Sequence, residues 1–428
     1  MRILIHGINF SPELTGIGKY SGELAEWLAL QGHEVRVVTA PPYYPQWKIA
    51  DGYANWWHKQ SVNLAKRLPA SGGGLLVYRC PLWVPAKPSG LKRLLHLASF
   101  ALTSLPVMLR QVFWRPHIVF VVEPPLFCAP QALLVARLSG ARAWLHVQDF
   151  EVDAAFDLGL IKGARLRSFV AAAERWLLSR FHKVSTISQR MLDRLLLKGV
   201  VADQCVFFPN WVDVSAIVPS PQAAGLNASR ANALSYRHEL GIDANAVVAL
   251  YSGNMGGKQG LEILAQATVL LGDLTGIVFV FCGNGAERPM LERECSGLEN
   301  VRFLDLQPLE RLGELLSMAD IHLLPQRADA ADLVMPSKLT GMLASGRPVV
   351  ATAIEGTELA KVVAGCGLVV PPATPMLFAD AIKRLVNDAG LRAGLGAAGR
   401  KYAEDFLDKG AVLSQFELNI KQLINAQK

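Results

Sequence analysis

The sequence has few of the residues that cross-link a chain or bind a structural metal. Its 428 residues include six cysteines, at positions 80, 128, 205, 282, 295 and 366. None forms a Cys-x-x-Cys pair or joins a spaced Cys/His cluster, which argues against a zinc site. A disulfide framework is unusual in so long a chain. We therefore expect isolated buried thiols in a reducing compartment.

An export signal is also missing, because the apolar run near Met1 is short and is interrupted by His6 and Gly7. The first residues predict a buried strand instead, and the protein is expected to stay in the cytoplasm. The longest apolar stretch, 91–112, has an uncharged core of 16 residues that is broken by Pro106. That core falls short of the about 20 residues that a membrane-spanning helix needs.

The stretch 91–112 leaves two interpretations open. Lys92, Arg93 and Arg110 flank it, and a helix of this kind can lie in a membrane interface. A crossover helix buried against a sheet is the alternative. The basic character of the surrounding half of the chain favours the membrane interface.

Composition excludes a disordered chain and predicts two domains. Hydrophobic residues make up 51% and charged residues 18%, and the mean hydropathy is +0.26. Single cores rarely grow beyond roughly 250–300 residues. Residues 1–213 hold 24 basic and 14 acidic residues, whereas the rest of the chain holds 19 and 22. The basic half indicates an anionic partner, either nucleic acid or a lipid surface. Nucleic acid is the weaker hypothesis, because no basic stripe is interleaved with aromatic residues.

Short apolar runs alternate with helical stretches in both halves, which predicts an α/β fold with two doubly wound parallel sheets. Residues 214–245 are rich in Pro, Gly, Asn and Ser and are predicted to be a linker. The expected organisation is therefore a first lobe over 1–213, a second lobe over 246–405, and a terminal helical segment, 406–428, that packs back toward the first lobe. Ligands of such sheets bind beyond the carboxyl ends of the strands, here in a cleft between the two lobes.

The predicted elements of the first lobe are six strands and four helices. The strands are expected at 2–8, 34–39, 75–79, 117–122, 143–147 and 183–187, and the helices at 18–30, 91–112, 126–138 and 164–181. In the second lobe we expect strands at 247–251, 277–282, 301–303, 321–324, 348–352 and 368–370. Helices are expected there at 261–270, 287–294, 309–318, 337–344, 375–386, 391–406 and 412–424.

One long connection, 40–74, interrupts this alternation and is rich in tyrosine and tryptophan. A loop of this length inside a compact lobe is often functional. An insertion that packs on itself is an equally good explanation.

Glycines after the first strand form the first motif. Gly16, Gly18 and Gly22 resemble a dinucleotide-binding fingerprint, but they lie too far beyond Ile8 for its tight turn. The second strand also ends without an acidic residue for a ribose. We predict a flexible loop at a helix N-terminus that binds a phosphate or sugar oxygen through Gly16 and Gly18.

A second motif is Pro336-Ser337-Lys338-Leu339 at a predicted helix start. Ser337 can cap this helix, and Lys338 adds a positive charge to its free amides. This combination suits a diphosphate. A solvated lysine is the alternative explanation.

A third motif, residues 252–260, directly follows the strand that opens the second lobe. It contains Gly253, Asn254 and Lys258 and leads into a helix. A glycine-rich loop with a lysine in this place again indicates phosphate binding, and a plain loop is the alternative.

Together these motifs resemble the retaining GT-B glycosyltransferases of family 4. The resemblance runs nearly the whole length and includes residues 28–35, 209–213, 252–254 and 346–350. The branch most similar to this chain makes colanic acid and uses GDP-fucose. The resemblance implies two Rossmann-like lobes, an acceptor-binding lobe at 1–213 and a nucleotide-sugar-binding lobe at 246–405.

The resemblance also implies the partners and the chemistry. A nucleotide sugar is the donor, a polyprenyl-linked oligosaccharide at an anionic membrane is the acceptor, and no cofactor or metal is needed. The sequence has no Asp-x-Asp motif. Lys258, Ser337 and Lys338 are expected to stabilise the leaving diphosphate. Asp149 or His146 is expected to orient the acceptor or take its proton, and Glu355 to hold donor hydroxyls.

The chain departs from the family pattern at several positions. Two family glutamates fall on Leu333 and Gly341, and the arginine usual after the glycine of the second-lobe loop is Asn254. The missing glutamates keep open a non-catalytic partner in glycan assembly. Because a fold does not fix the chemistry, a nucleotide-sugar epimerase or a glycoside phosphorylase with the same fold also stays open.

Overall fold

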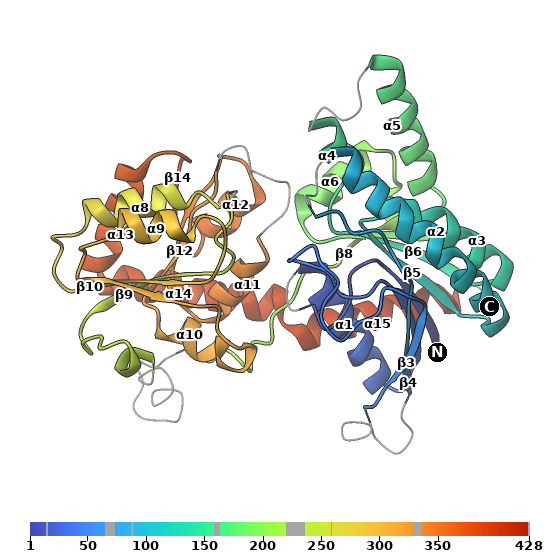
Figure 1. Cartoon of the computed structure of the whole chain (residues 1–428), viewed down its shortest axis with the longest axis horizontal. Helices are drawn as coiled ribbons and strands as arrows, with labels where there is room; N and C mark the ends of the chain where they lie inside the picture. The colour runs from blue at the N-terminus through green and yellow to red at the C-terminus, as the bar shows by residue number, and fades with distance from the viewer. Residues whose placement is uncertain are drawn as a thin grey trace. The chain divides into compact units, whose positions relative to one another are not determined.

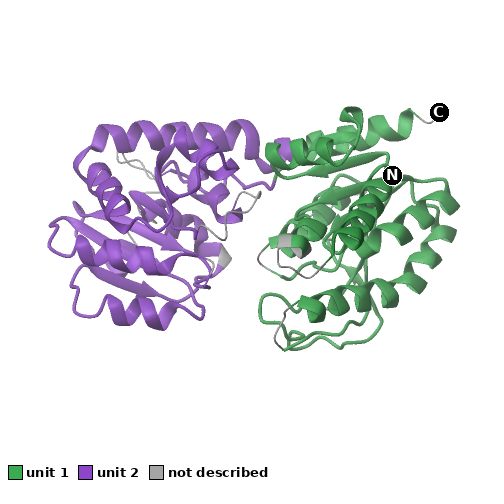
Figure 2. Cartoon of the chain, turned by 90° about the horizontal axis from the view of Figure 1, so that it is seen from above, with its two compact units in different colours: residues 1–209, 413–428 green, residues 210–412 purple. Residues whose placement is uncertain are grey.

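The computed structural model describes residues 1–13, 16–64, 73–86, 90–157, 163–219, 236–257, 259–327 and 336–426. The chain forms two compact units (Figure 2). Unit 1 contains residues 1–209 and 413–428, and unit 2 contains residues 210–412. Each unit is a parallel sheet covered by helices, as the apolar strands predict.

Unit 1 has an eight-stranded sheet in the order β3-β4-β2-β1-β5-β6-β7-β8 (Figure 1). All neighbouring strands pair in parallel except β3, which is antiparallel to β4. The strands are β1 (Arg2–His6), β2 (Glu34–Thr39), β3 (His58–Val62), β4 (Gly74–Arg79), β5 (Ile118–Glu123), β6 (Arg142–Val147), β7 (Lys183–Thr186) and β8 (Cys205–Phe207).

Helices cover both faces of this sheet. They are α1 (Gly16–Leu30), α2 (Gly90–Trp114), α3 (Ala129–Ser139), α4 (Glu151–Asp157), α5 (Ala164–Leu178) and α6 (Gln189–Leu197), with single 3-10 turns at Leu126–Cys128 and Ala202–Gln204. On one face, His6 of β1 bonds Ser104 of α2 at 3.1 Å. Because neighbours in parallel strands share a face, Phe120, which pairs with Ile5, lies on the opposite face.

The C-terminal helix α15 (Lys409–Asn425) begins in unit 2 and lies in unit 1 from Leu413 onward. Its Phe416 stacks on Phe208 with ring centroids 4.4 Å apart and meets Phe120 edge-on at 5.1 Å. Glu417 accepts a hydrogen bond from His33 at 2.8 Å. These contacts give the helix an apolar and a polar anchor on unit 1.

Unit 2 has a six-stranded parallel sheet in the order β11-β10-β9-β12-β13-β14. Its strands are β9 (Val247–Ser252), β10 (Ile277–Cys282), β11 (Val301–Leu304), β12 (Ile321–Leu324), β13 (Val349–Thr352) and β14 (Gly367–Val370). Its helices are α8 (Leu261–Leu270), α9 (Arg288–Glu294), α10 (Leu312–Met318), α11 (Ser337–Ala344), α12 (Glu358–Ala364), α13 (Pro375–Asn387) and α14 (Ala389–Tyr402). A 3-10 turn at Leu309–Arg311 and a π-helical turn at Ala403–Leu407 complete the unit.

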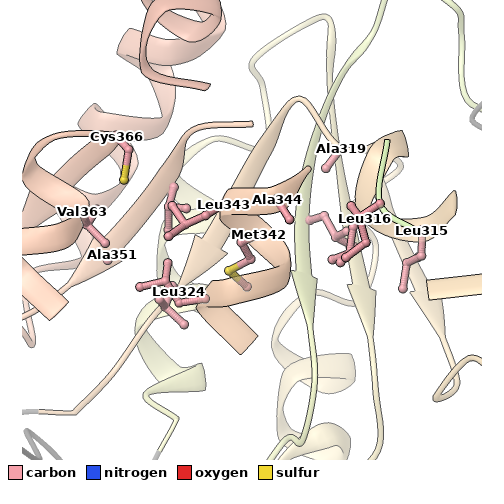
Figure 3. Close-up of a cluster of buried hydrophobic side chains, with 14 of the residues drawn as sticks. Leu315, Leu316, Ala319, Leu324, Met342, Leu343, Ala344, Ala351, Val363 and Cys366 are labelled. Carbon is pink, nitrogen blue, oxygen red and sulfur yellow. The ribbon is translucent and has the colours of Figure 1, made fainter. Parts of the chain in front are cut away.

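Two apolar clusters hold the helices of unit 2 on its sheet. One joins α10, α11 and α12 to the strands, and its members include Leu316, Leu324 and Leu343 (Figure 3). The other lies under α8 and α13 on the opposite face and includes Phe279 and Phe281. A sheet covered on both faces in this way explains why its strands contain few polar residues.

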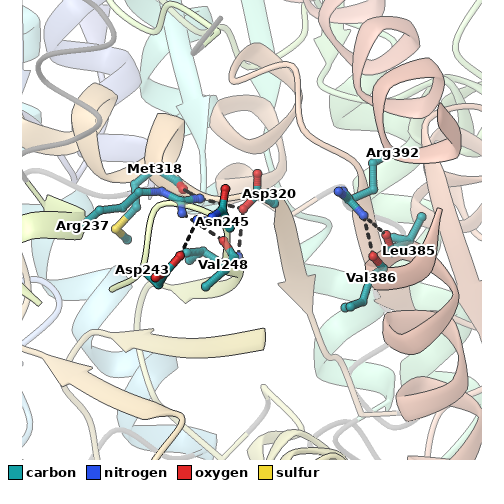
Figure 4. Close-up of polar contacts among 10 residues, drawn as sticks. Arg237, Asp243, Asn245, Val248, Met318, Asp320, Leu385, Val386 and Arg392 are labelled. Carbon is teal, nitrogen blue, oxygen red and sulfur yellow. Dashed lines mark hydrogen bonds and ion pairs between the residues drawn. The ribbon is translucent and has the colours of Figure 1, made fainter. Parts of the chain in front are cut away.

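Of the predicted linker 214–245 the structure describes 214–219 and 236–245, and some side chains in both pieces pack on unit 2. Ile217, Tyr236 and Ile242 are buried in the core of unit 2. Arg237 reaches the sheet and forms an ion pair with Asp320 at 2.7 Å (Figure 4). These few anchoring side chains could not be recognised in a segment whose composition is typical of a linker. Because they attach the segment to unit 2, the boundary between the units lies at 209/210.

The strands expected from the sequence are all present, with ends that shift by one or two residues. The elements β3, β8, α4 and α12 were not predicted, whereas α6 agrees with the helix face expected to carry Arg190 and Arg194. Strand β3 (His-Lys-Gln-Ser-Val) is an exposed edge with almost no apolar residue, and β8 has only three residues. Elements this short or this polar carry too little hydrophobic periodicity to be recognised.

Candidate active site

The order of strands in unit 2 reverses between β9 and β12. From β9 the chain proceeds outward through β10 and β11, and it then returns to the other side of β9 with β12. At such a switch point the loops beyond the two strand ends diverge and leave room for a ligand. The loop after β9 begins with Gly253, and the helix that follows β12 begins with Ser337 and Lys338.

Lys338 reaches from the start of α11 to the loop after β9. Its ammonium group donates a hydrogen bond to Gln259 Oε1 at 2.7 Å and lies 3.4 Å from the hydroxyl of Tyr251. The same nitrogen lies 4.5 Å from the centre of the Tyr251 ring. Gly253 lies beside the lysine stem, because a β-carbon at that position would be 3.5 Å from Lys338 Cδ.

The ammonium group of Lys338 is largely removed from water, a position in which a charged group usually has an ion-pair partner. No carboxylate among the described residues forms an ion pair with it. That desolvation lowers the pKa of Lys338 to about 7. Its partners among the described residues are an amide oxygen, a tyrosine hydroxyl and an aromatic ring, and none of them carries a charge. An anion bound beside this ammonium group would be strongly attracted to it.

Backbone groups around Lys338 are also suited to an anion. Helix α11 has Pro336 as its N-cap, and no side chain caps its first amides. The loop after β9 packs directly on the loop after β10: Gly253 N donates to Cys282 O, and Met255 N donates to Asn284 O. Position 283 must be glycine, since a β-carbon there would lie 1.9 Å from Gly253 O. The two loops thus form a rigid support beneath Lys338.

The other predicted donor-binding residues differ in their positions. Asn254 is exposed, and its carbonyl accepts a hydrogen bond from Tyr251 at 2.6 Å. Glu355 is exposed in the turn between β13 and α12. Lys258 lies outside the described residues.

Two expectations about the start of α11 are wrong. Ser337 does not cap the helix, because Pro336 occupies the N-cap and Ser337 is the first helical residue. The side chain of Leu339 is fully buried in the core, and its N–H donates to Pro336 O, so it cannot contact a ligand. From the sequence alone, the side of this short helix that packs on the core could not be distinguished from the side that carries Lys338.

Position 341, which corresponds to a family glutamate, faces the core of unit 2. A β-carbon on Gly341 would lie 3.0 Å from Leu316 Cδ1. A glutamate side chain there would enter the apolar cluster and not a nucleotide site. The other matching position, Leu333, lies outside the described residues.

Unit 1 contains a pocket of about 200 Å³ at its own switch point, where β1 lies between β2 and β5. The walls come from the loops after β1, β2, β5 and β6, from the start of α1 and from α2: Ile8, Asn9, Gly16, Ile17, Gly18, Tyr43, Tyr44, Trp47, Arg93, His96, Leu97, Pro124 and Asp149. The long connection 40–74 thus contributes three aromatic residues to the pocket. It also contains the edge strand β3, which does not line the pocket.

Glu13 holds two walls of this pocket together. Its carboxylate accepts hydrogen bonds from Asn9 Nδ2 at 2.9 Å and from the amides of Tyr43 and Tyr44 at 3.0 and 3.1 Å. Gly18 is required beside it, since a β-carbon there would lie 2.5 Å from Glu13 Oε2. Gly18 therefore has a packing role in addition to its place in the pocket wall, and Gly16 adopts a left-handed φ of 58° at the helix start.

The two residues expected to act on the acceptor separate in the structure. Asp149 lines the pocket, together with Gly16 and Gly18. His146 lies in the core of unit 1, where Nδ1 bonds Ser185 Oγ at 2.9 Å and the ring stacks on Phe120. Burial lowers the pKa of His146 to about 3. The structure does not bring His146 to the pocket with Asp149, because its side chain lies on the face of β6 that packs against Phe120 and Phe208.

Several residues of both sites were missed from the sequence. Gln259 lies within the third motif but was not singled out there, and Tyr251 and Glu13 belong to no motif, although each of the three follows or ends a strand at a switch point. Tyr43 and Trp47 lay in a segment recognised as aromatic, but its fold was not predictable. The position of each at a strand end in an α/β sheet was the signal that could have singled them out.

Known protein families match the sequences of both units. Residues 15–211 match the family described as the glycosyl transferase 4-like domain, and residues 246–388 match glycosyl transferases group 1. The chain is 43% identical over 434 residues to WcaI of Escherichia coli (strain K12), which bears the name of a colanic acid biosynthesis glycosyl transferase. That alignment covers 98% of this chain and all of WcaI. The chain belongs to this glycosyltransferase family.

Solved structures show the same fold across the full length of the glycosyltransferase. Sucrose-phosphate synthase from Thermosynechococcus elongatus is similar with a TM-score of 0.73 at 17% identity, covering all of both chains. Anabaena HepE in complex with UDP and glucose is similar with a TM-score of 0.65 at 15% identity, covering 99% of this chain and all of HepE. These likenesses confirm the predicted GT-B fold with two Rossmann-like parallel-sheet lobes, and the sequence matches given above confirm the family.

Proposed function

We propose that this glycosyltransferase takes its sugar from a nucleotide-diphosphate donor held in unit 2 by Lys338. The observation that carries the proposal is the desolvated ammonium of Lys338 beside the Gly253 loop, with no anionic partner among the described residues. A donor diphosphate supplies that partner. As the glycosidic bond breaks, negative charge grows on the leaving diphosphate, and a fixed cation lowers the barrier by binding this charge more tightly.

The proposed pathway is supported by the similarity to WcaI, and the proposed donor sugar and stereochemistry by the family resemblance. WcaI bears a colanic acid biosynthesis name, and we propose that this chain likewise adds a sugar to a lipid-linked glycan for an exopolysaccharide. GDP-fucose is the donor that we favour, and retention of the anomeric configuration follows from the family resemblance. Lys338 provides positive charge at the diphosphate without a metal ion, and the sequence has no Asp-x-Asp motif.

Thermal unfolding with a panel of nucleotide sugars tests this proposal. Only a ligand that binds the folded protein raises the unfolding midpoint, so the donor is the nucleotide sugar that raises it most. Incubation of that donor with lipid-linked acceptors then separates the functions. Transfer supports the proposal, a new nucleotide sugar without acceptor indicates an epimerase, and binding without any product indicates a non-catalytic partner. A panel that leaves the midpoint unchanged contradicts the proposal.

Helix α2 supports a second element, attachment to a membrane surface. Among the described residues it is the one helix that is long and apolar enough to cross a membrane by length and composition. One face packs on unit 1 through His96, Phe100 and Met108, all fully buried. The opposite face exposes an apolar stripe with helical spacing, here called the α2 stripe: Leu91, Leu95, Leu102, Leu109 and Phe113. A helix with one packed and one apolar exposed face is suited to lie on a bilayer.

Charge around the α2 stripe favours an anionic bilayer at the cytoplasmic face of a membrane. Between residues 52 and 148 the sequence has 11 Lys and Arg residues and one acidic residue, Glu123, which is buried. Helix α3 lies beside α2 and exposes Leu134 and Leu138 next to Arg137 (Figure 1). Exposed apolar side chains with exposed cations on the same helices, here Lys92, Arg110 and Arg137, bind to anionic headgroups and to the acyl boundary together.

Replacing two residues of the α2 stripe should release the protein from vesicles. We expect Leu102→Glu with Phe113→Glu to reduce partitioning onto phosphatidylethanolamine–phosphatidylglycerol vesicles by about 100-fold, since each side chain contributes ~1.5–3 kcal/mol when buried. Sedimentation of protein with the vesicles measures it. The matched control is Met376→Glu with Leu377→Glu on α13, which are also exposed but belong to unit 2. A wild-type protein that stays in the supernatant contradicts membrane attachment.

A further inference from the structure

Two of the loops that line the pocket of unit 1 follow β5 and β6, and the second of them carries Asp149. The backbone joins the ends of these strands, since Gln148 N donates to Glu123 O at 3.0 Å. A side chain makes a second link: Glu151 is the first residue of α4, and its Oε2 accepts a hydrogen bond from Leu126 N at 2.5 Å. The position of Asp149 is therefore fixed on both sides along the chain.

A second carboxyl group, that of Glu123 at the end of β5, lies close to Glu151. Glu123 is 1% exposed, and its Oε1 has no hydrogen-bond partner among the described residues. Burial raises the pKa of Glu123 well above its ordinary value, and the charges of Glu151 and Glu174 raise it further. A buried carboxyl group in such surroundings is held in its protonated, neutral form. Glu123 therefore gives Glu151 a neutral neighbour and no counter-charge.

Glu151 carries a proton up to about neutral pH. Burial of its carboxyl group raises its pKa to about 7, the charge of Asp149 acts in the same direction, and the hydrogen bond from Leu126 N and the charge of Arg93 act against them. Titratable and charged groups face the two carboxyl groups from several elements: Arg93 of α2, Cys128 of the 3-10 turn, Asp149 before α4, and Glu174 of α5, which is paired with Lys198 of α6. Arg93 offsets only part of the effect of burial, so an ionised Glu151 is poorly balanced between the loops.

We propose that Glu151 is a positioning residue for Asp149, and that it holds Asp149 at the pocket as long as it carries a proton. The proposal rests on the proposed sugar transfer and on the predicted role of Asp149 in it. A protonated Glu151 keeps its hydrogen bond from Leu126 N and adds no charge beside Asp149. An ionised Glu151 places a like charge two positions along the chain from Asp149, and the start of α4 then moves away. Because the pKa of Glu151 is raised in the closed arrangement, that arrangement is favoured at low pH and is lost as the pH rises toward about 7.

The pH profile of kcat at saturating nucleotide sugar tests the proposal, because a change in donor affinity does not affect kcat under that condition. Wild-type kcat should fall by about tenfold per pH unit above a midpoint at or below about pH 7. Glutamine can accept from Leu126 N but cannot ionise, so Glu151→Gln should match the wild type at low pH and keep its kcat above pH 7. Glu151→Ala loses the hydrogen bond and should reduce kcat by about 10- to 100-fold at every pH, because Asp149 is no longer held in place. Glu34→Gln, exposed at the start of β2, is the control and should follow the wild-type profile.

An infrared titration tests the proton on Glu151 without any sugar transfer, so it separates this proposal from the donor proposal. The band of protonated carboxyl groups should weaken between about pH 6 and pH 8 in the wild type and in Glu34→Gln, but not in Glu151→Gln. A band that weakens equally in Glu151→Gln overturns the protonated Glu151. A kcat of Glu151→Gln that falls with pH as in the wild type overturns the link to Asp149, and a wild-type kcat in Glu151→Ala overturns the positioning role. If Glu151→Ala does not fold, the lost pH dependence of Glu151→Gln supports that role and a retained one overturns it.

Discussion

Lys338→Met is expected to reduce sugar transfer by about 100- to 1,000-fold and to abolish the thermal stabilisation by the nucleotide sugar. Removing one preformed donor to a developing oxyanion has an effect of that size, and Lys338 provides a full charge as well. Methionine keeps the apolar stem beside Gly253 and the Tyr251 ring, so the substitution removes little except the ammonium group. Steady-state kinetics and thermal unfolding with the donor measure both effects.

The stability of Lys338→Met distinguishes a ligand site from a structural lysine. An ammonium that is desolvated without an anion disfavours the folded state, so we expect the unliganded variant to be as stable as the wild type or more stable. Lys383→Ala on α13, an exposed lysine, is the matched control and should change neither binding nor stability. A Lys338→Met protein that binds the donor within about threefold of wild type would contradict the assignment.

The same lysine makes donor affinity depend on pH in a predictable direction. In the free protein its pKa is lowered to about 7, and a bound diphosphate raises it again. The complex therefore takes up a proton above pH 7, so affinity is greatest below that pH and falls by up to about tenfold per unit above it. The diphosphate of a nucleotide sugar stays ionised throughout. Lys338→Arg should bind with little change over this range, since arginine remains protonated.

The sequence predicted the fold more reliably than it predicted the site, for a physical reason. Buried parallel strands such as Val247–Ser252 and Ile277–Cys282 are covered on both faces and are therefore continuous apolar runs. Such runs can be recognised directly in the sequence. The segment 214–245, which composition predicts to be a linker, is the opposite case. Here one ion pair, Arg237 with Asp320, and a few apolar residues hold a segment whose average composition indicates a loop.

Site residues were predictable where a backbone rule applied and not where side-chain direction decided. Gly253 and Lys338 follow strands at the switch point of unit 2, and a rule about open sheets was enough to single them out. His146 failed because a shift of one position along β6 moves a side chain to the opposite face of the sheet. Arg93 was not predicted as a pocket residue because it lies on α2, which is apolar on both its buried and its exposed face. The sequence does not show which of these faces packs on the sheet.

Arg237→Met should destabilise unit 2 by about 3–5 kcal/mol, the second large effect expected of a single substitution. Asp320 is 3% exposed, and its Oδ2 accepts from Arg237 at 2.7 Å and from Val248 N at 2.8 Å. Without the guanidinium, this carboxylate stays buried with one backbone donor and without its ion-pair partner, and Arg347 is the cation that still acts on it (Figure 4 shows the intact contacts). Arg237 also donates to Ala246 O and Met318 O, which would lose a partner.

Hydrogen exchange assigns the loss to one unit, because an unfolding midpoint averages over both units. Amides of β9 and β12, which flank Asp320, should exchange faster in Arg237→Met, whereas those of β1 and β5 in unit 1 should keep their protection. Lys401→Met, which breaks an exposed pair with Asp405 on the surface of the same unit, should leave both patterns unchanged. Adding Asp320→Asn to Arg237→Met removes the unpaired charge and should restore part of the protection. Unchanged exchange in β9 would mean that apolar packing alone holds residues 236–245 on the sheet.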